Sequence, residues 1–134
     1  MKNKKIMKIG LLCIKNKRLL VVHKKTINLY ITPGGKIEHN ETNEECLQRE
    51  TREEIGCDVK DLKFFKGFKA IQPDGSVLSQ ECYFGQLTGD ISLNLSDNID
   101  GFLWIERNYN ERKVKLAPML EYQIIPELIK EGLL

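Results

Sequence analysis

This sequence of 134 residues has few histidines, a small net charge and no long apolar run. It has only two histidines, and its four cysteines include no C-x-x-C pair, which argues against a histidine-rich metal site, a zinc site and a disulfide framework. The net charge is +2, too small for the basic field that polymeric nucleic acid binding usually requires. No apolar stretch approaches the length needed to cross a bilayer. We therefore expect a small-molecule partner, and neither polymeric nucleic acid nor a membrane.

The N-terminal segment carries lysines ahead of a short apolar run, as a signal peptide does. The run at residues 9–14 is short, however, and a basic stretch at 15–18 follows it directly, which argues against a signal peptide. The cytoplasm is the simplest compartment to expect. A composition of 41% hydrophobic and 30% charged residues, at this length, predicts a single globular domain over residues 1–134. The sequence leaves open whether it is a monomer or a homodimer.

Five apolar segments bounded by turn-forming residues predict β-strands, at 6–14, 18–23, 59–71, 76–87 and 102–105. The first two would form an antiparallel hairpin around a polar turn at 15–17. The third and fourth would flank the turn at 72–75, and the whole set would make a mixed sheet. From Pro118 onward, apolar residues at helical spacing predict a helix that Pro126 would kink or divide.

A further helix is predicted over residues 43–55. Thr42 and Glu45 fit a capping box, in which each side chain satisfies a backbone N–H at the start of the helix. Apolar or small residues recur every fourth position from 47 to 55 and would form its buried stripe, and Gly56 suits a left-handed cap at its end. A loop at 28–40 precedes the helix, and its glycines let the backbone approach a ligand closely.

Three carboxylates, those of Glu50, Glu53 and Glu54, fall on one face of this helix within an arc of roughly 100°. Like charges at this spacing repel one another and weaken a helix. One interpretation is a solvated acidic surface, which is the usual meaning of such a run. The other is a cation site, because carboxylate oxygens and a loop carbonyl suit a hard ion such as Mg²⁺ or Mn²⁺, and these ions bind phosphates in turn.

The segment 35–57 resembles the Nudix box, G-x5-E-x7-R-E-U-x-E-E-x-G-U, where U is apolar. Its seven fixed positions are all matched, by Gly35, Glu41, Arg49, Glu50, Glu53, Glu54 and Gly56. The two softer U positions hold Thr51 and Cys57. With a Pro-Gly-Gly sequence leading into the box and a late strand around Trp104, the chain is similar to the MutT-like members of the Nudix hydrolase superfamily.

The resemblance implies an α/β/α sandwich with a mixed β-sheet and a loop–helix–loop over the box. It implies that Glu50, Glu53 and Glu54 hold Mg²⁺, or Mn²⁺ as a substitute, with the Gly35 carbonyl as a further ligand. Glu50 and Glu53 would also act in catalysis. Arg49 would serve catalysis by orienting the acidic side chains through salt bridges, and Glu41 would brace the loop.

Some members of the superfamily use a further acidic residue outside the box as a base or an extra ligand. Asp97, just ahead of the Trp104 strand, is the first candidate for this catalytic role, and Glu81 and Asp100 are the reserves. The candidates for substrate binding are Tyr30, Gly34 and Gly35. For Tyr30, packing in the core is an equally good interpretation.

The resemblance also implies an enzyme that hydrolyses the diphosphate linkage of a nucleotide. The leading hypothesis is a nucleoside triphosphate pyrophosphohydrolase that releases a nucleoside monophosphate and pyrophosphate, with oxidised nucleotides such as 8-oxo-dGTP as candidate substrates. An ADP-ribose or nucleotide-sugar diphosphatase is the alternative, because Pro73 stands about where those relatives often carry a proline. A non-catalytic nucleotide-sensing module is a further alternative, although such modules usually lose box acids that this sequence keeps.

Overall fold

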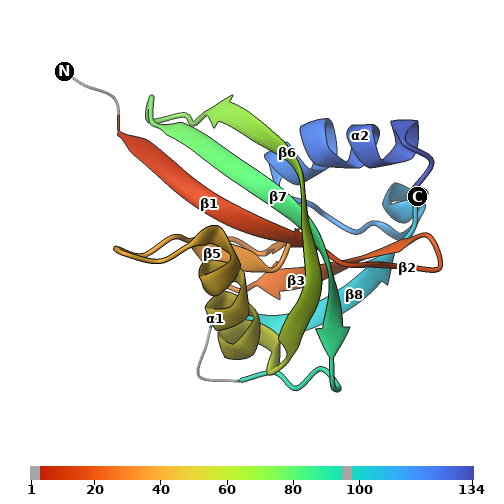
Figure 1. Ribbon diagram of the computed structural model, residues 1–134. Helices are drawn as coiled ribbons and strands as arrows, with labels where there is room; N and C mark the ends of the chain where they lie inside the picture. The colour runs from red at the N-terminus through yellow and green to blue at the C-terminus, as the bar shows by residue number, and fades with distance from the viewer. Residues whose placement is uncertain (1–3, 95–97) are drawn as a thin grey trace.

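The computed structural model describes residues 4–94 and 98–134. Asp97, the first candidate for an acidic residue outside the box, therefore lies outside the described residues. The described residues form two β-sheets with helical segments on both sides (Figure 1). The elements are β1 (Lys5–Leu12), β2 (Ile14–Lys15), β3 (Arg18–Lys24), β4 (Leu29–Ile31), β5 (Gly34–Lys36), α1 (Asn43–Ile55), β6 (Asp58–Ile71), β7 (Val77–Thr88), β8 (Ile99–Ile105), the 3₁₀ turn η1 (Tyr109–Arg112), the π-helical segment η2 (Leu120–Ile124) and α2 (Ile125–Lys130).

The first sheet has the strand order β5-β1-β7-β6, and it is mixed, as the sequence predicted. Strands β1 and β7 run parallel, whereas β5 pairs with β1 and β6 pairs with β7 in the antiparallel sense. The second sheet is antiparallel and is built around β3, which pairs with β8 along one edge and with β2 and β4 along the other. The candidate site lies where the two sheets meet the loop ahead of α1.

The prediction that residues 6–14 pair with residues 18–23 in a hairpin was wrong for most of the first strand. Strand β1 ends at Leu12 and pairs with β7 and β5, and only the short β2 pairs with β3. The turn itself is where the sequence placed it, and Asn16 and Lys17 both have positive φ, at 50° and 59°, as a two-residue hairpin turn requires. An apolar run shows that a strand is buried but not which strand it pairs with.

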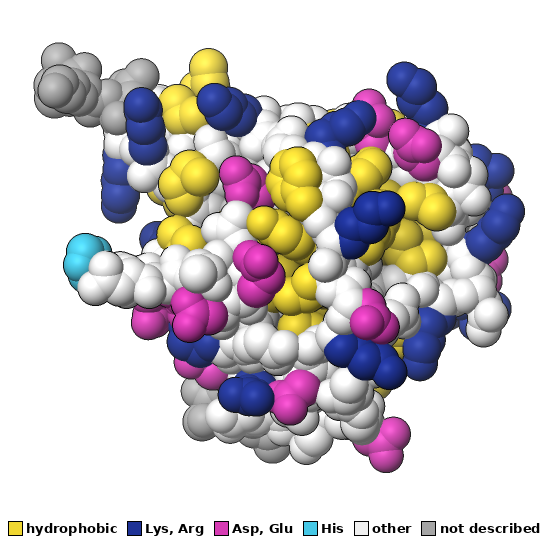
Figure 2. Space-filling model, viewed as in Figure 1, with side chains coloured by type: hydrophobic (Ala, Val, Ile, Leu, Met, Phe, Trp, Pro, Cys, Tyr) yellow, Lys and Arg dark blue, Asp and Glu magenta, His cyan; other side chains and the backbone are white. Residues whose placement is uncertain are grey.

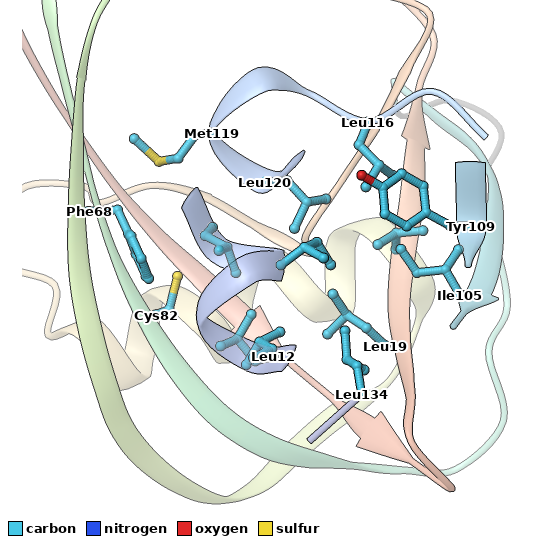
Figure 3. Packing of buried hydrophobic residues seen from close by; sticks show 14 residues of the cluster. Leu12, Leu19, Phe68, Cys82, Ile105, Tyr109, Leu116, Met119, Leu120 and Leu134 are labelled. Atoms are coloured by element: carbon cyan, nitrogen blue, oxygen red, sulfur yellow. The ribbon is translucent and has the colours of Figure 1, made fainter. Parts of the chain in front are cut away.

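Strand β3 is buried on both faces, and its alternate side chains enter two separate apolar clusters. Leu19 and Val21 contribute to the cluster that includes the C-terminal helical segment, and Leu20 and Val22 to the cluster that includes α1. Figure 3 shows the first cluster, to which the strands contribute Leu12, Leu19 and Ile105 and η2 contributes Leu120. Helices thus cover opposite sides of the sheets, which confirms the α/β/α sandwich. The cysteines are buried and free, as expected of core thiols.

The C-terminal helical segment changes from π-helical to α-helical hydrogen bonding just before Pro126. The N–H of Ile125 donates to the carbonyl of Leu120, five residues earlier, which is the hydrogen bond of a π-helix. Pro126 has no N–H to continue the ladder and stands at the start of α2. The predicted helix after Pro118 is therefore confirmed, but helical structure runs without a gap through Pro126, so the predicted division is not.

The surface in the view of Figure 1 carries charges of both signs. Figure 2 shows hydrophobic side chains near the centre of this face, with lysine and arginine interspersed with aspartate and glutamate around them. This face shows no continuous basic field. In the described parts of the chain, no helix is long and apolar enough to cross a membrane.

Candidate active site

Helix α1 is capped at both ends as its sequence predicted, and the caps fix where the box residues stand. The N–H of Glu45 donates to the Thr42 hydroxyl at 3.1 Å, and the N–H of Thr42 donates to the Glu45 carboxylate at 2.9 Å. Gly56 closes the helix with φ at 68°, in the left-handed region. Leu47, Thr51 and Ile55 are fully buried. This buried stripe sets the rotation of the helix, and it turns Glu50 and Glu54 toward the preceding loop.

The loop at Gly34 and Gly35 packs directly against these two carboxylates. The N–H of Gly34 donates to Oε1 of Glu54 at 2.9 Å, and Glu54 is only 6% exposed. Gly34 has a φ of 135°, and a Cβ there would stand 2.0 Å from the carbonyl oxygen of Ile9. A Cβ on Gly35 would lie 2.7 Å from the Glu50 carboxylate. Both glycines are required because a side chain would fill the space that the carboxylates and backbone occupy.

Arg49 is the centre of an ion-pair network on the adjoining side of α1. Its Nε and Nη2 donate to the two carboxylate oxygens of Glu41, at 2.7 and 3.0 Å, in a bidentate pair. Its Nη1 donates to Glu50 at 2.9 Å and to Glu53 at 3.4 Å. The hydrogen bonds from Arg49 lower the pKa of Glu41 to about 2, so Glu41 stays ionised. Nη2 also donates to the Lys36 carbonyl at 3.1 Å, which ties the loop to the helix.

The three box carboxylates differ in their surroundings. The Glu50 side chain is 17% exposed and Glu54 is buried, whereas the Glu53 side chain is 54% exposed and turns toward Arg49. Within residues 4–94 and 98–134, no group of three His, Cys, Asp or Glu is already gathered around one point. The structure thus brings Glu54 to Gly34 and Glu50 to Gly35 and leaves Glu53 outside this pair. An oxygen-only donor set of this kind fits Mg²⁺ or Mn²⁺ and does not fit zinc.

A cleft of about 850 Å³ opens beside Glu50 and Glu54. Its lining combines charged and polar groups with apolar side chains. The two carboxylates, the Gly34–Gly35 backbone and three lysines all line it. Its walls come from both sheets and from the segment that leads into η2, and the apolar residues are Ile9, Ile27, Leu29, Ile31, Ala70, Ile71, Pro73, Leu78, Ile99, Ala117, Pro118, Met119 and Leu120. A cleft lined by both charged and apolar groups suits a ligand that joins phosphates to a ring.

Tyr30 does not line this cleft, although the sequence offered it for substrate binding. Its neighbours Leu29 and Ile31 face the cleft, and in a strand the side chain between them points to the opposite face. The Tyr30 ring lies 5.0 Å from the His23 ring and packs against the cluster on the α2 side. Its position therefore agrees with the core-packing interpretation.

The reserve candidates for an acidic residue outside the box also have partners elsewhere. Asp100 accepts from Nδ1 of His23 at 2.5 Å, and this contact lowers the pKa of Asp100. Glu81 accepts from the Asn43 amide at 2.6 Å, near the start of α1. Neither residue lines the cleft, so the structure does not bring them to Glu50 and Glu54.

Several residues that line the cleft were not predicted from the sequence. Lys8, Lys24 and Lys36 line the cleft. Thr32 and Gln80 line it too, and the Gln80 amide donates to the Thr32 hydroxyl at 3.1 Å. A usable signal was available for Lys8, because it is a charged residue within the largely apolar run that forms β1. The others come together only through strand pairing.

Comparison with known proteins identifies the family. Residues 5–127 match the family model described as the NUDIX domain. The chain therefore belongs to the NUDIX family. The family match covers α1, its capping segments and both sheets, and it confirms the resemblance seen in the box.

Three individual proteins are similar to parts or all of the chain. The Putative 8-oxo-dGTP diphosphatase YtkD of Bacillus subtilis (strain 168) is 38% identical over 58 residues, which are 43% of this chain and 36% of that protein. The 8-oxo-dGTP diphosphatase of Proteus vulgaris is 39% identical over 54 residues, 37% of this chain and 48% of that protein. The chain thus spans between about a third and a half of these curated relatives. The solved structure of a NUDIX hydrolase from Nitrosomonas europaea superposes on this chain with a TM-score of 0.78 and 17% sequence identity. The match covers 96% of this chain and 90% of that one, and it shows that the two share a fold.

Proposed function

We propose that this chain is a Mg²⁺-dependent hydrolase of nucleoside triphosphates that releases a nucleoside monophosphate and pyrophosphate, with 8-oxo-dGTP among its candidate substrates. The observation that carries the proposal is the pair of carboxylates, Glu50 and Glu54, held against Gly34 and Gly35 in the lining of the cleft. The partial relatives named 8-oxo-dGTP diphosphatases support the choice of substrate. We also propose that it acts in the cytoplasm, as a monomer or homodimer, and not on polymeric nucleic acid or at a membrane.

The residues that would hold the metal ion are Glu50 and Glu54, with Glu53 and the Gly35 carbonyl as further ligands. A bound Mg²⁺, or Mn²⁺ in its place, neutralises phosphate charge and makes a coordinated water more acidic. Arg49 holds the Glu50 carboxylate in position through its hydrogen bond of 2.9 Å. The Gly34 N–H holds the Glu54 carboxylate in position in the same way. These contacts prepare the carboxylates before the substrate arrives.

In the proposed reaction, a water oxygen bonds to a phosphorus in the phosphate chain of the substrate. The bond from that phosphorus to the bridging oxygen breaks. The electron pair stays on the bridging oxygen, which leaves as part of pyrophosphate, and the attacking water loses a proton. Glu53 is our candidate acceptor for this proton because of its place in the box, and it would have to turn from Arg49, which it contacts at 3.4 Å, toward Glu50 and Glu54. The apolar side chains that line the cleft would hold the base and exclude water from it.

A second candidate function is an ADP-ribose or nucleotide-sugar diphosphatase. One observation favours it, because Pro73, the residue that suggested this activity in the sequence, lines the cleft. The same carboxylates would serve, and only the group beyond the cut linkage would differ. A non-catalytic module remains the third candidate.

A substrate panel tests these proposals. The purified chain is incubated with Mg²⁺ and, separately, with nucleoside triphosphates including 8-oxo-dGTP, with ADP-ribose and with nucleotide sugars, and the products are separated. Pyrophosphate release from a triphosphate is expected. Cleavage of ADP-ribose or a nucleotide sugar alone would replace the first proposal by the second, and nucleotide binding without any turnover would favour the sensing module.

A further inference from the structure

Gly10 lies inside β1 at a point where its neighbours leave no room for a side chain. A Cβ on Gly10 would stand 2.4 Å from the amide nitrogen of Gln80 and 3.0 Å from the hydroxyl oxygen of Thr32. Glycine in the interior of a strand weakens that strand, and it often marks a place where another group approaches closely. Here the approaching groups are polar, and Thr32 and Gln80 both line the cleft. Gly10 therefore makes room for a pair of polar side chains outside the box.

The amide group of Gln80 is held in one orientation by two contacts. Its nitrogen donates to the Thr32 hydroxyl at 3.1 Å and to Sγ of Cys82 at 3.5 Å, so both N–H groups of the amide are engaged. Within residues 4–94 and 98–134, no hydrogen bond reaches the side-chain oxygen of Gln80. Gln80 is half-buried. The one polar atom that it leaves for a ligand is therefore an acceptor.

Strand register gives Gln80 a partly apolar setting. Gln80 stands opposite Phe68 across the β6–β7 pair, and Phe68 is only 7% exposed. Leu78, two residues earlier on the same face of β7, also lines the cleft. An acceptor that is removed from water in such a setting without a new partner costs free energy, and a donor on the ligand offsets that cost. A ligand that covers Gln80 thus binds well only if it brings an N–H or O–H group to this oxygen.

We propose that Gln80 is a specificity-determining residue, whose side-chain oxygen accepts a hydrogen bond from an N–H group on the ring of the substrate. Thr32 is a positioning residue, because its hydroxyl fixes which end of the Gln80 amide is left for the ring. This inference rests on the proposed function and concerns the choice of ring in the same cleft. Thr32 stands two residues ahead of Gly34, whose N–H binds the Glu54 carboxylate, so one short segment contacts both Gln80 and the box.

An acceptor held in this way selects between rings that differ at a single nitrogen. Guanine has a lone pair at N7, and oxidation to 8-oxoguanine places a hydrogen on this nitrogen and an oxygen on the neighbouring carbon. The N–H of the oxidised ring donates to the Gln80 oxygen, whereas the lone pair of guanine faces it as a second acceptor and leaves both without a partner. A site built to bond one group rejects the analogue that lacks it. Gln80 therefore favours 8-oxoguanine over guanine.

The test compares how tightly the whole protein binds 8-oxo-dGMP and dGMP, two nucleotides that differ only by this oxidation. Isothermal titration calorimetry in the presence of Mg²⁺ gives both dissociation constants, and their ratio measures the selectivity. We expect the wild type to bind 8-oxo-dGMP about tenfold or more tightly than dGMP. Gln80→Leu should bring the ratio close to one. Gln86→Leu, the same change on β7 at a residue that does not line the cleft, should keep the wild-type ratio.

Two further variants test the direction of the contact. Gln80→Glu keeps an acceptor and has no N–H, so it should retain the preference for 8-oxo-dGMP while its charge weakens binding of both nucleotides. Thr32→Val removes the hydroxyl that holds the amide, so the amide can turn over and the ratio should fall. Thr32→Val also takes the place of Gln80→Leu should that variant fail to fold.

The outcomes separate this inference from the proposed function. A wild type without a preference overturns the inference, as does a ratio that neither Gln80→Leu nor Thr32→Val lowers, and loss of the preference in Gln80→Glu overturns the role as acceptor. If the wild type cleaves nucleoside triphosphates but the ratio does not depend on Gln80, the inference fails and the proposed function stands. If 8-oxo-dGMP is preferred in a Gln80-dependent way but no nucleotide is cleaved, the inference stands and the proposed function fails.

Discussion

The backbone N–H of Gly34 donates a hydrogen bond of 2.9 Å to Oε1 of Glu54, a residue in the last turn of α1. This bond joins the loop ahead of the helix to the far end of that helix. One turn earlier, the Glu50 carboxylate lies where a side chain on Gly35 would be. The position of both carboxylates therefore depends on the absence of side chains in the loop.

Replacing Gly35 by alanine should reduce turnover while leaving the fold intact. The new Cβ would stand 2.7 Å from the Glu50 carboxylate and push it out of place. Displacements on the order of 1 Å at a reacting centre cost roughly 100-fold in rate, and we expect a loss of about that size. Steady-state kinetics and a thermal melt measure the two effects. Gly101→Ala is the control, because a Cβ there meets only an ordinary contact at 3.8 Å, and wild-type kinetics in Gly35→Ala would contradict the account.

Replacing Gly56 by alanine should destabilise the chain more than the same change at Gly132. Both glycines have left-handed φ values, 68° and 73°, so each substitution carries a backbone cost of about 1 kcal/mol. At Gly56 the new Cβ would also lie 2.9 Å from the Ser92 carbonyl oxygen, whereas at Gly132 it meets nothing within 4 Å. Urea unfolding of both variants measures the difference. Equal losses would show that Ser92 moves away at no cost.

The pair between Glu41 and Arg49 should make stability depend on acid pH. The pKa of Glu41 in the folded chain is about 2, below its ordinary value of 4.5. The stability that the ionised Glu41 carboxylate contributes to the fold is therefore present above pH 4.5 and is lost as the pH falls toward 2. Glu41→Gln should therefore lower stability at neutral pH, and its deficit relative to wild type should shrink across that range. Urea unfolding at a series of pH values measures it, with Glu131→Gln as an exposed control. A deficit that does not change with pH would contradict the pairing.

His23 should titrate above its ordinary value. Nδ1 faces Asp100 at 2.5 Å and Nε2 faces the Asn28 side-chain oxygen at 2.9 Å, so both ring nitrogens have acceptors, and the contact with Asp100 raises the pKa of His23 above 6.5. Its contribution to stability is thus present below pH 6.5 and is lost as the pH rises through the folded pKa. Titration of the ring by NMR gives the value, and Asp100→Asn should lower it. A wild-type pKa at or below 6.5 would rule out this arrangement.

Helix α1 was predicted to the residue because its signals are local. Thr42, Glu45 and Gly56 act on backbone groups within one turn of themselves, and the buried stripe needs only the helical repeat. The carboxylates Glu50 and Glu54 were found by the same local reasoning. Their partners in the loop were found because the box fixes the spacing from Gly35.

The pairing of β1 and the walls of the cleft could not be predicted in this way. β1 pairs with β7 more than sixty residues later, and no local pattern carries that information. Tyr30 was predicted to bind substrate because of its place in the chain. Successive side chains of a strand point to opposite faces of the sheet, however, and Leu29 and Ile31 are the residues that line the cleft. Lys8 and Lys36 meet only once β1 and β5 are paired.

Metal-dependent turnover in wild type and Glu54→Gln tests the central claim most directly. Glutamine keeps an oxygen that can accept from the Gly34 N–H, so the fold should survive, but it removes the charge that the ion needs. Hydrolysis of the best nucleotide is measured against Mg²⁺ concentration, with Glu44→Gln, an exposed change in the first turn of α1, as the control. We predict Mg²⁺-dependent turnover in the wild type and in Glu44→Gln, and a loss of about 100-fold or more in Glu54→Gln. Near-normal rates with unchanged Mg²⁺ dependence in Glu54→Gln and Glu50→Gln would contradict the proposed metal site.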